Sequence, residues 1–406
     1  MGKIRHCIFI IIAVFGFLCF FSLDALGYSY ENPLRVRIGD STGATVTVTS
    51  GSYLLSPTGR TVSAGAAVIL TSGTALSSLD GQGRFLFEGT EYRGDIANRN
   101  GNIVNTLDLE KYLYSVVACE IGGYAPAEDA LKAQAICSRN FAYRKKQSPR
   151  SSDYDILNNT SDQVYKGFSG EKYDSAVALR IRNAVDETAD KVMYYDGMLV
   201  NATYMANAGG ATEDAGIVWG GKYPYLKGVL CPWDSQPFVG DAGTYVSLKF
   251  PTSAQWTVVL SFADLAKKVS GIGTITDVSV DHTGSVAGYA VKVTVTGTGG
   301  TKSYKGTEFR SLLGLRSACF DVVIGSSVVG KRALSAEYVG SAAFASTFAV
   351  SGKTLTINGR GYGHNIGMSQ WSACVMADKG YRYYEILDYF FNQGKNDGRL
   401  TLTAYH

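Results

Sequence analysis

The sequence predicts a mixed α+β fold, because strand-like and helix-like segments follow one another without a regular βα repeat. Residues 33–106 contain short alternating segments such as LRVRIG and ATVTVTS, separated by Gly, Ser and Asn, which is typical of antiparallel strands. Residues 108–146 instead place apolar side chains at helical spacing. No internal repeat is present, so we expect one large domain over residues 28–406.

The remaining segments continue this mixture of helices and strands. They are predicted in this order: a polar surface loop (145–163), a helix (175–190), a hairpin that turns at Asp196 and Gly197 (191–207), a smaller β-rich lobe with a short helix inside it (245–330), a strand (353–359), a glycine-rich loop, and one helix from about Met368 to residue 391.

The N-terminus predicts export. A basic start, MGKIRH, precedes a run of 17 apolar residues at 7–23, and small residues follow at Ala25 and Gly27. Residues 1–27 are therefore a signal peptide or, since the run is near the lower limit of spanning length, an N-terminal membrane anchor. Nothing amphipathic favours a buried core helix. Both interpretations put the rest of the chain at the outer face of the cell membrane or in the cell-wall space.

Composition excludes several other classes of protein. Hydrophobic residues make up 46% and charged residues 18%, which fits neither a disordered chain nor a multispan membrane protein. The net charge is only +3 and no Lys/Arg block occurs, so no nucleic-acid partner is expected. Five cysteines lie outside the leader without a C-x-x-C pair, so a disulfide framework is not expected, although one isolated bond stays open.

Glu120 is the strongest candidate for a catalytic residue. Asp108 is a plausible N-cap of the segment LEKYLYSVVACEI, in which Leu113, Val116 and Glu120 share one helix face. Gly122 and Gly123 then predict a left-handed helix end. Burial and the negative end of the helix dipole would both raise the pKa of Glu120, as a general acid requires. The alternative is that the last turn frays and Glu120 reaches solvent.

The following helix begins at about Pro126 and carries polar residues that could reach a ligand or lie in solvent: Lys132, Gln134 and Arg139. A second cluster of candidate binding residues lies at 204–234. It combines glycines, an amide, a hydroxyl and flat rings, which could stack on sugars or pack in a core: Asn207, Gly209, Gly210, Thr212, Trp219 and Trp233.

A third concentration at 359–380 places His364 among four glycines. It lacks the lysine of a phosphate loop and the βαβ context of a dinucleotide site. No set of His, Cys and carboxylate residues has metal-ligand spacing, so we expect neither a metal nor another cofactor. A hydrolase that pairs His364 with Cys374 or Cys137 is a remaining alternative.

Several segments together resemble the stage II sporulation protein D family, whose domain also occurs in amidase-enhancer proteins. The resemblance covers roughly residues 33–394 and rests on these stretches: YRG (92–94), LEKYLYSVVACEI, EDALKAQAICSRNFAY, GGATEDAGIVWGG, PYLKGV, PWD, FRSLLGLRSACF and GRGYGHNIGMSQWSACVMADKGYRYYEIL.

The resemblance implies a lytic transglycosylase that cuts the β-1,4 bond between N-acetylmuramic acid and N-acetylglucosamine in peptidoglycan, on strands that a partner amidase has stripped of stem peptides. It implies Glu120 as the catalytic residue. The substrate contacts expected from the residues and the resemblance together are Lys132, Gln134, Arg139, Asn207, Gly209, Gly210, Thr212, Trp219, His364, Ser369 and Gln370.

The chain departs from the family's pattern in three places. The usual STSGG is ANAGG here, so Asn207 replaces a hydroxyl contact, and GHGVGMSQ is GHNIGMSQ. The loop 147–166 has no Cys or His, so the zinc cluster of some clostridial members is not expected. A different class of function also stays open: a glycan-binding module that stimulates an amidase without cutting sugar.

Overall fold

The molecule is described from a computed structural model, which describes residues 27–406 except 125, 172–174, 240–244, 247–254 and 333–345. The predicted leader or anchor, apart from Gly27, lies outside the described residues. In the part of the chain that is described, no helix is long and apolar enough to cross a membrane. Helices and several separate sheets occur together, so the predicted α+β class is confirmed.

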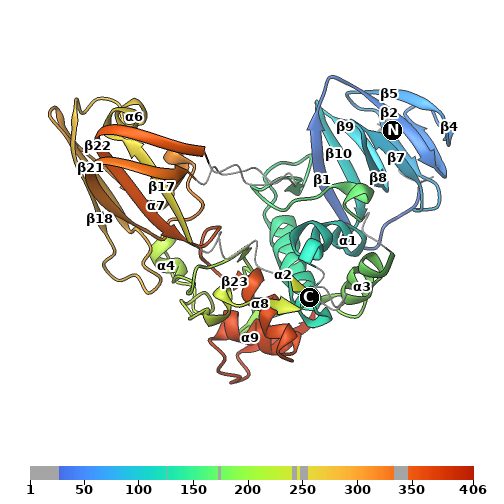
Figure 1. Cartoon of the computed structure of the whole chain (residues 1–406). Coiled ribbons are helices and arrows are strands. Elements are labelled where there is room, and N and C mark those ends of the chain that lie inside the picture. Colours follow the sequence, from blue (N-terminus) through green and yellow to red (C-terminus); the bar gives the residue numbers. More distant parts are fainter. Residues whose placement is uncertain (1–26, 125, 172–174, 240–244, 247–254, 333–345) are drawn as a thin grey trace, which may run out of the picture.

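The first part of the chain is all β, as predicted (Figure 1). Side chains alternate between buried and exposed along β1, where Leu34, Val36 and Ile38 point into the core. Two sheets result, ordered β11-β1-β10-β9-β6-β3-β4 and β5-β2-β7-β8. The strands are β1 (Pro33–Asp40), β2 (Gly43–Ser50), β3 (Ser52–Ser56), β4 (Arg60–Ser63), β5 (Ala67–Thr71), β6 (Ala75–Ser78), β7 (Arg84–Phe87), β8 (Thr90–Arg93), β9 (Asp95–Arg99), β10 (Asn102–Asp108) and β11 (Ile156–Leu157).

A helical block follows, consisting of α1 (Leu109–Glu120), α2 (Glu128–Gln147) and α3 (Ser175–Asp186). The apolar stripe of α1 is fully buried, and buried alanines on α2, such as Ala130 and Ala133, allow close packing beside it. Two predicted details differ. The Asp108 side chain makes no capping hydrogen bond, and Pro126 lies just before α2 instead of in its first turn.

The end of α1 also differs from the prediction. Gly122 and Gly123 do not form a left-handed cap, because Gly122–Tyr124 continues as a right-handed 3₁₀ turn. The Ile121 N–H donates to the Val117 carbonyl, so the last helical turn stays closed. Glu120 is therefore held in regular helix up to its own position.

A second hydrophobic core, separate from the one that contains the buried residues of β1 and α1, lies on the other side of the molecule (Figure 1). It is built from Trp256, Phe309, Leu355, Ile357 and neighbouring apolar residues, and so includes side chains beyond residue 330. The elements here are β17 (Gln255–Ser261), α6 (Phe262–Lys268), β18 (Ile275–Asp281), β19 (Lys292–Gly297), β20 (Gly300–Lys305), α7 (Gly306–Leu313), β21 (Phe320–Arg332) and β22 (Ser346–Arg360). Two three-stranded sheets form, β17-β22-β21 and β18-β19-β20.

The C-terminal part contains two helices, α8 (Gln370–Asp378) and α9 (Tyr383–Asn392), so the prediction of one continuous helix is wrong. The break falls at Gly380, whose φ of 90° lies in the left-handed region that glycine tolerates. The hairpin at Asp196–Gly197 is confirmed. Short elements complete the chain: β12 (Lys191–Tyr195), β13 (Met198–Leu199), β14 (Tyr204–Met205), α4 (Ala215–Val218), β15 (Phe238–Val239), β16 (Tyr245–Val246), β23 (Met368–Ser369) and β24 (Leu400–Ala404).

One short pairing positions the site. Strands β14 and β23 are parallel, with Tyr204 opposite Met368 and Met205 opposite Ser369. This pairing brings the start of α8 next to α2 and the end of α1 (Figure 1).

Candidate active site

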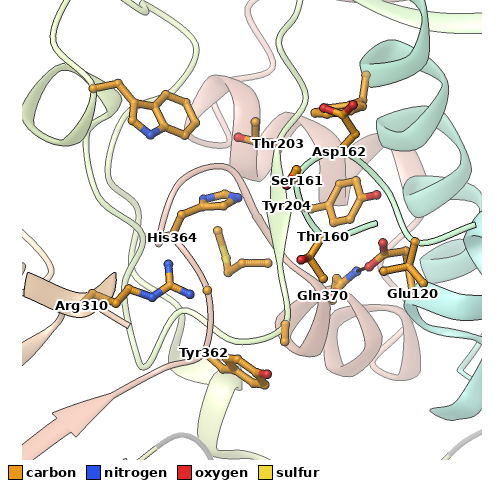
Figure 2. Close-up of a pocket in the computed structure, with 16 residues that line it drawn as sticks. Glu120, Thr160, Ser161, Asp162, Thr203, Tyr204, Arg310, Tyr362, His364 and Gln370 are labelled. Carbon is orange, nitrogen blue, oxygen red and sulfur yellow. Dashed lines mark hydrogen bonds between the residues drawn. The ribbon is translucent and has the colours of Figure 1, made fainter. Parts of the chain in front are cut away.

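A cavity of about 510 Å³ opens where the helical block, the loop before α8 and the second core meet. Figure 2 shows Glu120 and Gln370 on one side and Arg310 on the other. The lining residues are Glu120, Phe141, Thr160, Ser161, Asp162, Val164, Thr203, Tyr204, Met205, Ala206, Trp219, Arg310, Tyr362, Gly363, His364 and Gln370.

Glu120 lies at the end of α1 with its half-buried side chain in this cavity. The Gln370 Nε2 donates a hydrogen bond of 3.1 Å to the Glu120 Oε2. Burial raises the pKa of Glu120, and it outweighs the hydrogen bonds from Gln370, the Val164 backbone and Tyr204, which lower it. The predicted direction of the pKa shift is thus confirmed, and burial is its main cause.

Gln370 is positioned by the fold behind it. It is the first residue of α8, directly after the Ser369 N-cap. Its Nε2 also donates to the Gln134 Oε1 on α2 at 3.3 Å, and Gln134 in turn donates to Ser138 at 3.0 Å. The amide of Gln370 is therefore fixed between two helices with its donor aimed at Glu120. Gln134 does not line the cavity and acts on it only through Gln370.

A buried carboxylate, Asp234, anchors the same region from behind. It accepts hydrogen bonds from the hydroxyls of Ser369 (2.6 Å) and Ser372 (2.7 Å) and from the Gly210 N–H (3.1 Å). Burial raises its pKa. The Asn207 amide donates to the Asp234 carbonyl at 3.0 Å. Asp234 thereby ties the loop after β14 to the N-terminus of α8.

The glycine-rich candidates belong to this support and not to the cavity wall. Gly209 donates its N–H to the Asn207 side chain at 2.7 Å, and the Thr212 hydroxyl accepts from the Val229 N–H at 2.9 Å. Asn207, Thr212 and Ser369 are almost completely buried. Gly210 lies beside Asp234, as described above. None of these five candidate positions lines the cavity: Asn207, Gly209, Gly210, Thr212 and Ser369.

His364 and Trp219 do line the cavity, and their ring centroids are 5.7 Å apart. The His364 Nδ1 accepts a hydrogen bond from the Ile366 N–H at 3.1 Å. Burial, helped by the nearby Arg310, lowers the pKa of His364 to about 4, so the ring is neutral at pH 7. Trp219 is 42% exposed and Tyr362 is 48% exposed, so both offer ring faces to a ligand.

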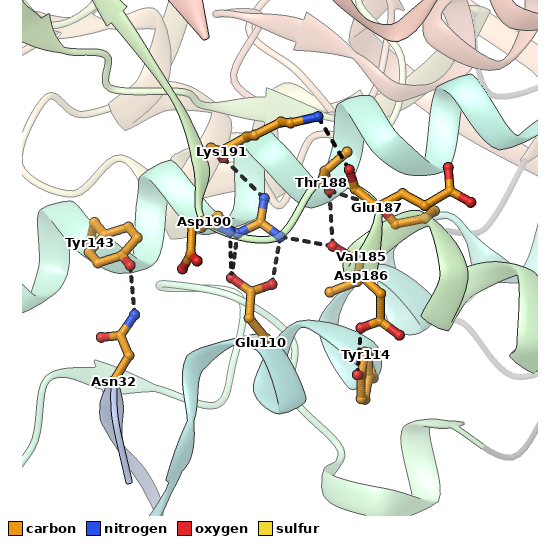
Figure 3. Close-up of polar contacts among 12 residues, drawn as sticks. Asn32, Glu110, Tyr114, Tyr143, Val185, Asp186, Glu187, Thr188, Asp190 and Lys191 are labelled. Carbon is orange, nitrogen blue, oxygen red and sulfur yellow. Dashed lines mark hydrogen bonds and ion pairs between the residues drawn. The ribbon is translucent and has the colours of Figure 1, made fainter. Parts of the chain in front are cut away.

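Two predicted contacts on α2 lie elsewhere. The Lys132 Nζ pairs with Glu128 (2.6 Å) and Glu187 (2.5 Å). Arg139 has no exposed side-chain surface and binds both oxygens of Glu110, at 2.7 and 2.6 Å. Figure 3 shows Glu110 beside the strand and helix ends that carry Lys191 and Val185, whose carbonyls also accept from Arg139. Neither Lys132 nor Arg139 lines the cavity.

The lining residues that the sequence did not indicate include four with large or charged polar side chains: Asp162, Tyr204, Arg310 and Tyr362. Asp162 lies in the polar stretch that predicted a surface loop, yet its side chain has no exposed surface. It pairs with Lys145 and, at 3.0 Å, with Arg150, and it accepts from the Leu157 N–H at 2.9 Å. The Asn-Thr-Ser-Asp composition signals a loop, but nothing in it indicates that the loop folds inward.

Glu120 and Asp162 are the two carboxylates of the cavity lining. Asp162 is held by two cations and a backbone N–H, so it is not available to a substrate. Glu120 instead accepts hydrogen bonds from uncharged groups, namely the Gln370 amide, the Val164 backbone and Tyr204, and it faces the open volume. The cavity lining therefore offers one available carboxylate, not a pair.

The described residues contain neither a cysteine paired with His364 in the cavity nor a cluster of metal ligands. All five cysteines of the described chain are free, and burial raises the pKa of the Cys137 and Cys374 thiols. Neither thiol lines the cavity next to His364. Within the described residues, no group of three His, Cys, Asp or Glu side chains is arranged to hold a metal.

Comparison with known proteins agrees with the motifs. Residues 97–195, which include Glu120, match the family described as Stage II sporulation protein. The chain is 30% identical over 300 residues to Stage II sporulation protein D of Bacillus amyloliquefaciens, covering 71% of this chain and 74% of that protein. The chain belongs to the stage II sporulation protein D family.

Other relatives align at similar levels of identity. The protein of that name from Bacillus subtilis (strain 168) is 29% identical over 301 residues, covering 71% of this chain and 74% of the relative. An amidase enhancer from the same organism is 28% identical over 300 residues, covering 68% of this chain but 38% of the relative.

Proposed function

We propose that this chain is a peptidoglycan lytic transglycosylase with Glu120 as its general acid and base. The observation that carries the proposal is the single available carboxylate, with a raised pKa, in a cavity lined by exposed rings. A glycoside hydrolase usually needs two carboxyl groups, one to protonate the leaving oxygen and one to act as base or nucleophile. A transglycosylase needs one, because the substrate supplies its own nucleophile.

The reaction follows from this arrangement. Protonated Glu120 donates its proton to the β-1,4 glycosidic oxygen, and the C1–O4 bond of N-acetylmuramic acid breaks as an oxocarbenium-like charge develops. The C6 hydroxyl of the same sugar attacks C1, and the Glu120 carboxylate accepts the hydroxyl proton. The products are a 1,6-anhydro end and a free C4 hydroxyl, and Glu120 is protonated again.

The surrounding residues have separate roles in this proposal. The Gln370 amide stabilises the carboxylate that forms after the first proton transfer. Trp219 and Tyr362 offer ring faces to sugars. Asn207, Gly209, Gly210, Thr212 and Ser369 hold the loop and the start of α8 in place.

The biological setting is proposed from the family. The relatives named Stage II sporulation protein D suggest remodelling of the cell wall during sporulation, including engulfment. The substrate would be glycan strands stripped by a cell-wall amidase. With residues 1–27 as leader or anchor, the domain would act outside the membrane, in a spore former between the mother-cell and forespore membranes.

Analysis of the products tests the proposal. Wild-type protein incubated with stripped and with peptide-bearing peptidoglycan should release fragments with 1,6-anhydro ends, detected by mass spectrometry as a loss of 18 mass units relative to hydrolysed ends. Reducing ends instead would indicate a hydrolase.

A second function is favoured by the amidase-enhancer relative: a glycan-binding module that stimulates an amidase without cutting sugar. The discriminating result is stimulation of a purified amidase by a protein that releases no anhydro fragments. If the stimulation is lost when Glu120 is replaced, amidase stimulation and glycan cleavage would instead depend on the same residue.

The hydrogen bond from Gln370 makes a separate prediction. Replacing Gln370 by leucine removes a donor that lowers the pKa of Glu120, so the alkaline limb of the kcat/KM profile should move to higher pH. The rate should fall about 10- to 100-fold, the effect expected for a hydrogen bond to a charged group. Initial rates from pH 5 to 9 measure both the position of the limb and the rate.

Gln82→Leu, at an exposed position outside the cavity, is the control and should change neither the limb nor the rate. An unmoved limb in Gln370→Leu would contradict the assigned role.

A further inference from the structure

Arg310 is a cation from the second core that reaches the cavity of Glu120. It lies on α7, and it is the one Lys or Arg among the residues that line the described cavity. Figure 2 shows it between His364 and Tyr362, across the cavity from Glu120. The second core thus contributes a positive charge to a site whose acid comes from the helical block.

The guanidinium of Arg310 is incompletely satisfied by the protein. Its Nε donates to the Leu315 carbonyl at 3.2 Å. In the part of the chain that the structure describes, no carboxylate forms an ion pair with it. Burial lowers the pKa of Arg310, which means that its charge lacks full solvation. The adjacent His364 is neutral at pH 7 and cannot supply a negative charge.

An unpaired, partly buried guanidinium in a ligand cavity has a clear chemical complement. Its planar fork matches a carboxylate, with which it forms two parallel charge-assisted hydrogen bonds. The cavity supplies no such partner, since Asp162 is bound by Lys145 and Arg150 and Glu120 lies on the opposite side. The missing anion would therefore come with the substrate.

We propose that Arg310 binds the lactyl carboxylate of N-acetylmuramic acid and so makes the site selective for glycan without stem peptides. The proposal rests on the function proposed above. The lactyl group ends in a charged carboxylate only after an amidase has removed the peptide. On a peptide-bearing strand the same carbon is a neutral amide, which offers no charge to Arg310. Pairing with Arg310 also keeps the substrate's negative charge away from Glu120, which must be protonated when the reaction begins.

Binding in an inactive background tests this proposal separately from catalysis. The background is Glu120→Gln, and calorimetry compares three tetrasaccharides: stripped muramic-acid glycan, the same glycan with its lactyl carboxylates converted to methyl amides, and a chitin oligosaccharide without lactyl groups. Glu120→Gln should bind the carboxylate form about 10- to 100-fold more tightly than the other two, as expected for hydrogen bonds between charged groups. Adding Arg310→Gln should reduce that preference to about twofold or less, with unchanged affinity for the amide and the chitin ligand.

Two further variants separate the effect of the charge from that of the guanidinium geometry and provide a surface control. Arg310→Lys keeps the charge but not the fork, and should retain part of the preference. Arg60→Gln, an exposed arginine on β4, should retain all of it. A preference that survives Arg310→Gln, an equal loss of affinity for all three ligands, or no binding of any ligand would overturn the proposal. Arg310-dependent binding of a peptide-bearing glycan would place the anion on the stem peptide and overturn the lactyl assignment.

The two proposals can fail independently. If wild-type protein releases no anhydro ends but the carboxylate preference depends on Arg310, the catalytic proposal is wrong and the recognition stands. If anhydro ends form and Arg310→Gln keeps the preference, the recognition is wrong and the catalysis stands.

Discussion

Replacing Glu120 by glutamine should lower the rate of anhydro-end formation on stripped glycan by at least about 10²- to 10⁴-fold, the usual contribution of a general acid and base. Glutamine fills the same space but neither donates the acidic proton nor accepts one from the C6 hydroxyl. Asp162, the other carboxylate of the cavity lining, is held by Lys145 and Arg150 and cannot substitute. Initial rates by mass spectrometry measure the loss.

The fold of this variant should survive, which makes the loss interpretable. The folded-state pKa of Glu120 lies above its ordinary value of 4.5, so its contribution to stability is complete below pH 4.5 and is lost as the pH rises through the folded pKa. Glu120→Gln cannot ionise and should melt at the same temperature as wild type or higher at pH 8, with the difference shrinking toward pH 4.

Glu31→Gln, an exposed change outside the cavity, is the matched control for the rate and should behave as wild type. Full activity in Glu120→Gln would show that another group cuts the strand.

Replacing Arg139 by alanine should reduce the free energy of unfolding by about 3–5 kcal/mol, the effect of breaking a buried ion pair. The side chain has no exposed surface, binds both oxygens of Glu110, and donates to the carbonyls of Lys191 and Val185. Its removal deprives Glu110 of its cationic partner and each of the two carbonyls of one donor, and it opens a void between α1, α2 and α3. Urea denaturation monitored by circular dichroism measures the change.

The Glu110→Ala single variant and the double variant complete the cycle, and the double should be less destabilised than the sum of the two singles. If Arg139→Ala keeps its stability but loses glycan affinity, the ligand contact expected from the sequence is correct and the structural role is wrong.

Local patterns predicted much of the fold because they record which face of a segment is buried. Two-residue alternation identified β1 and its neighbours, and the stripe of Leu113 and Val116 placed Glu120 on the inner face of α1. The same periodicity does not say what each side chain meets. Gln134 and Arg139 looked equivalent on α2, yet one supports Gln370 and the other pairs with Glu110.

The residues that were missed depend on long-range contacts. Arg310 reaches the cavity because the second core lies across from the helical block. Asp162 turns inward because its carboxylate forms ion pairs with Lys145 and Arg150. The break at Gly380 does have a local signal, since a glycine inside a helical pattern can end the helix.

The hydrogen bond between Gln370 and Glu120 joins positions 250 residues apart. Because synthesis runs from the N-terminus, the growing chain therefore carries Glu120 long before it carries the amide that donates to it. A protein cut after α2 would likewise keep the acid and lose its partner. Under the function proposed above, chain order alone delays full activity, because the acid meets its amide partner only when nearly the whole chain has been made and folded.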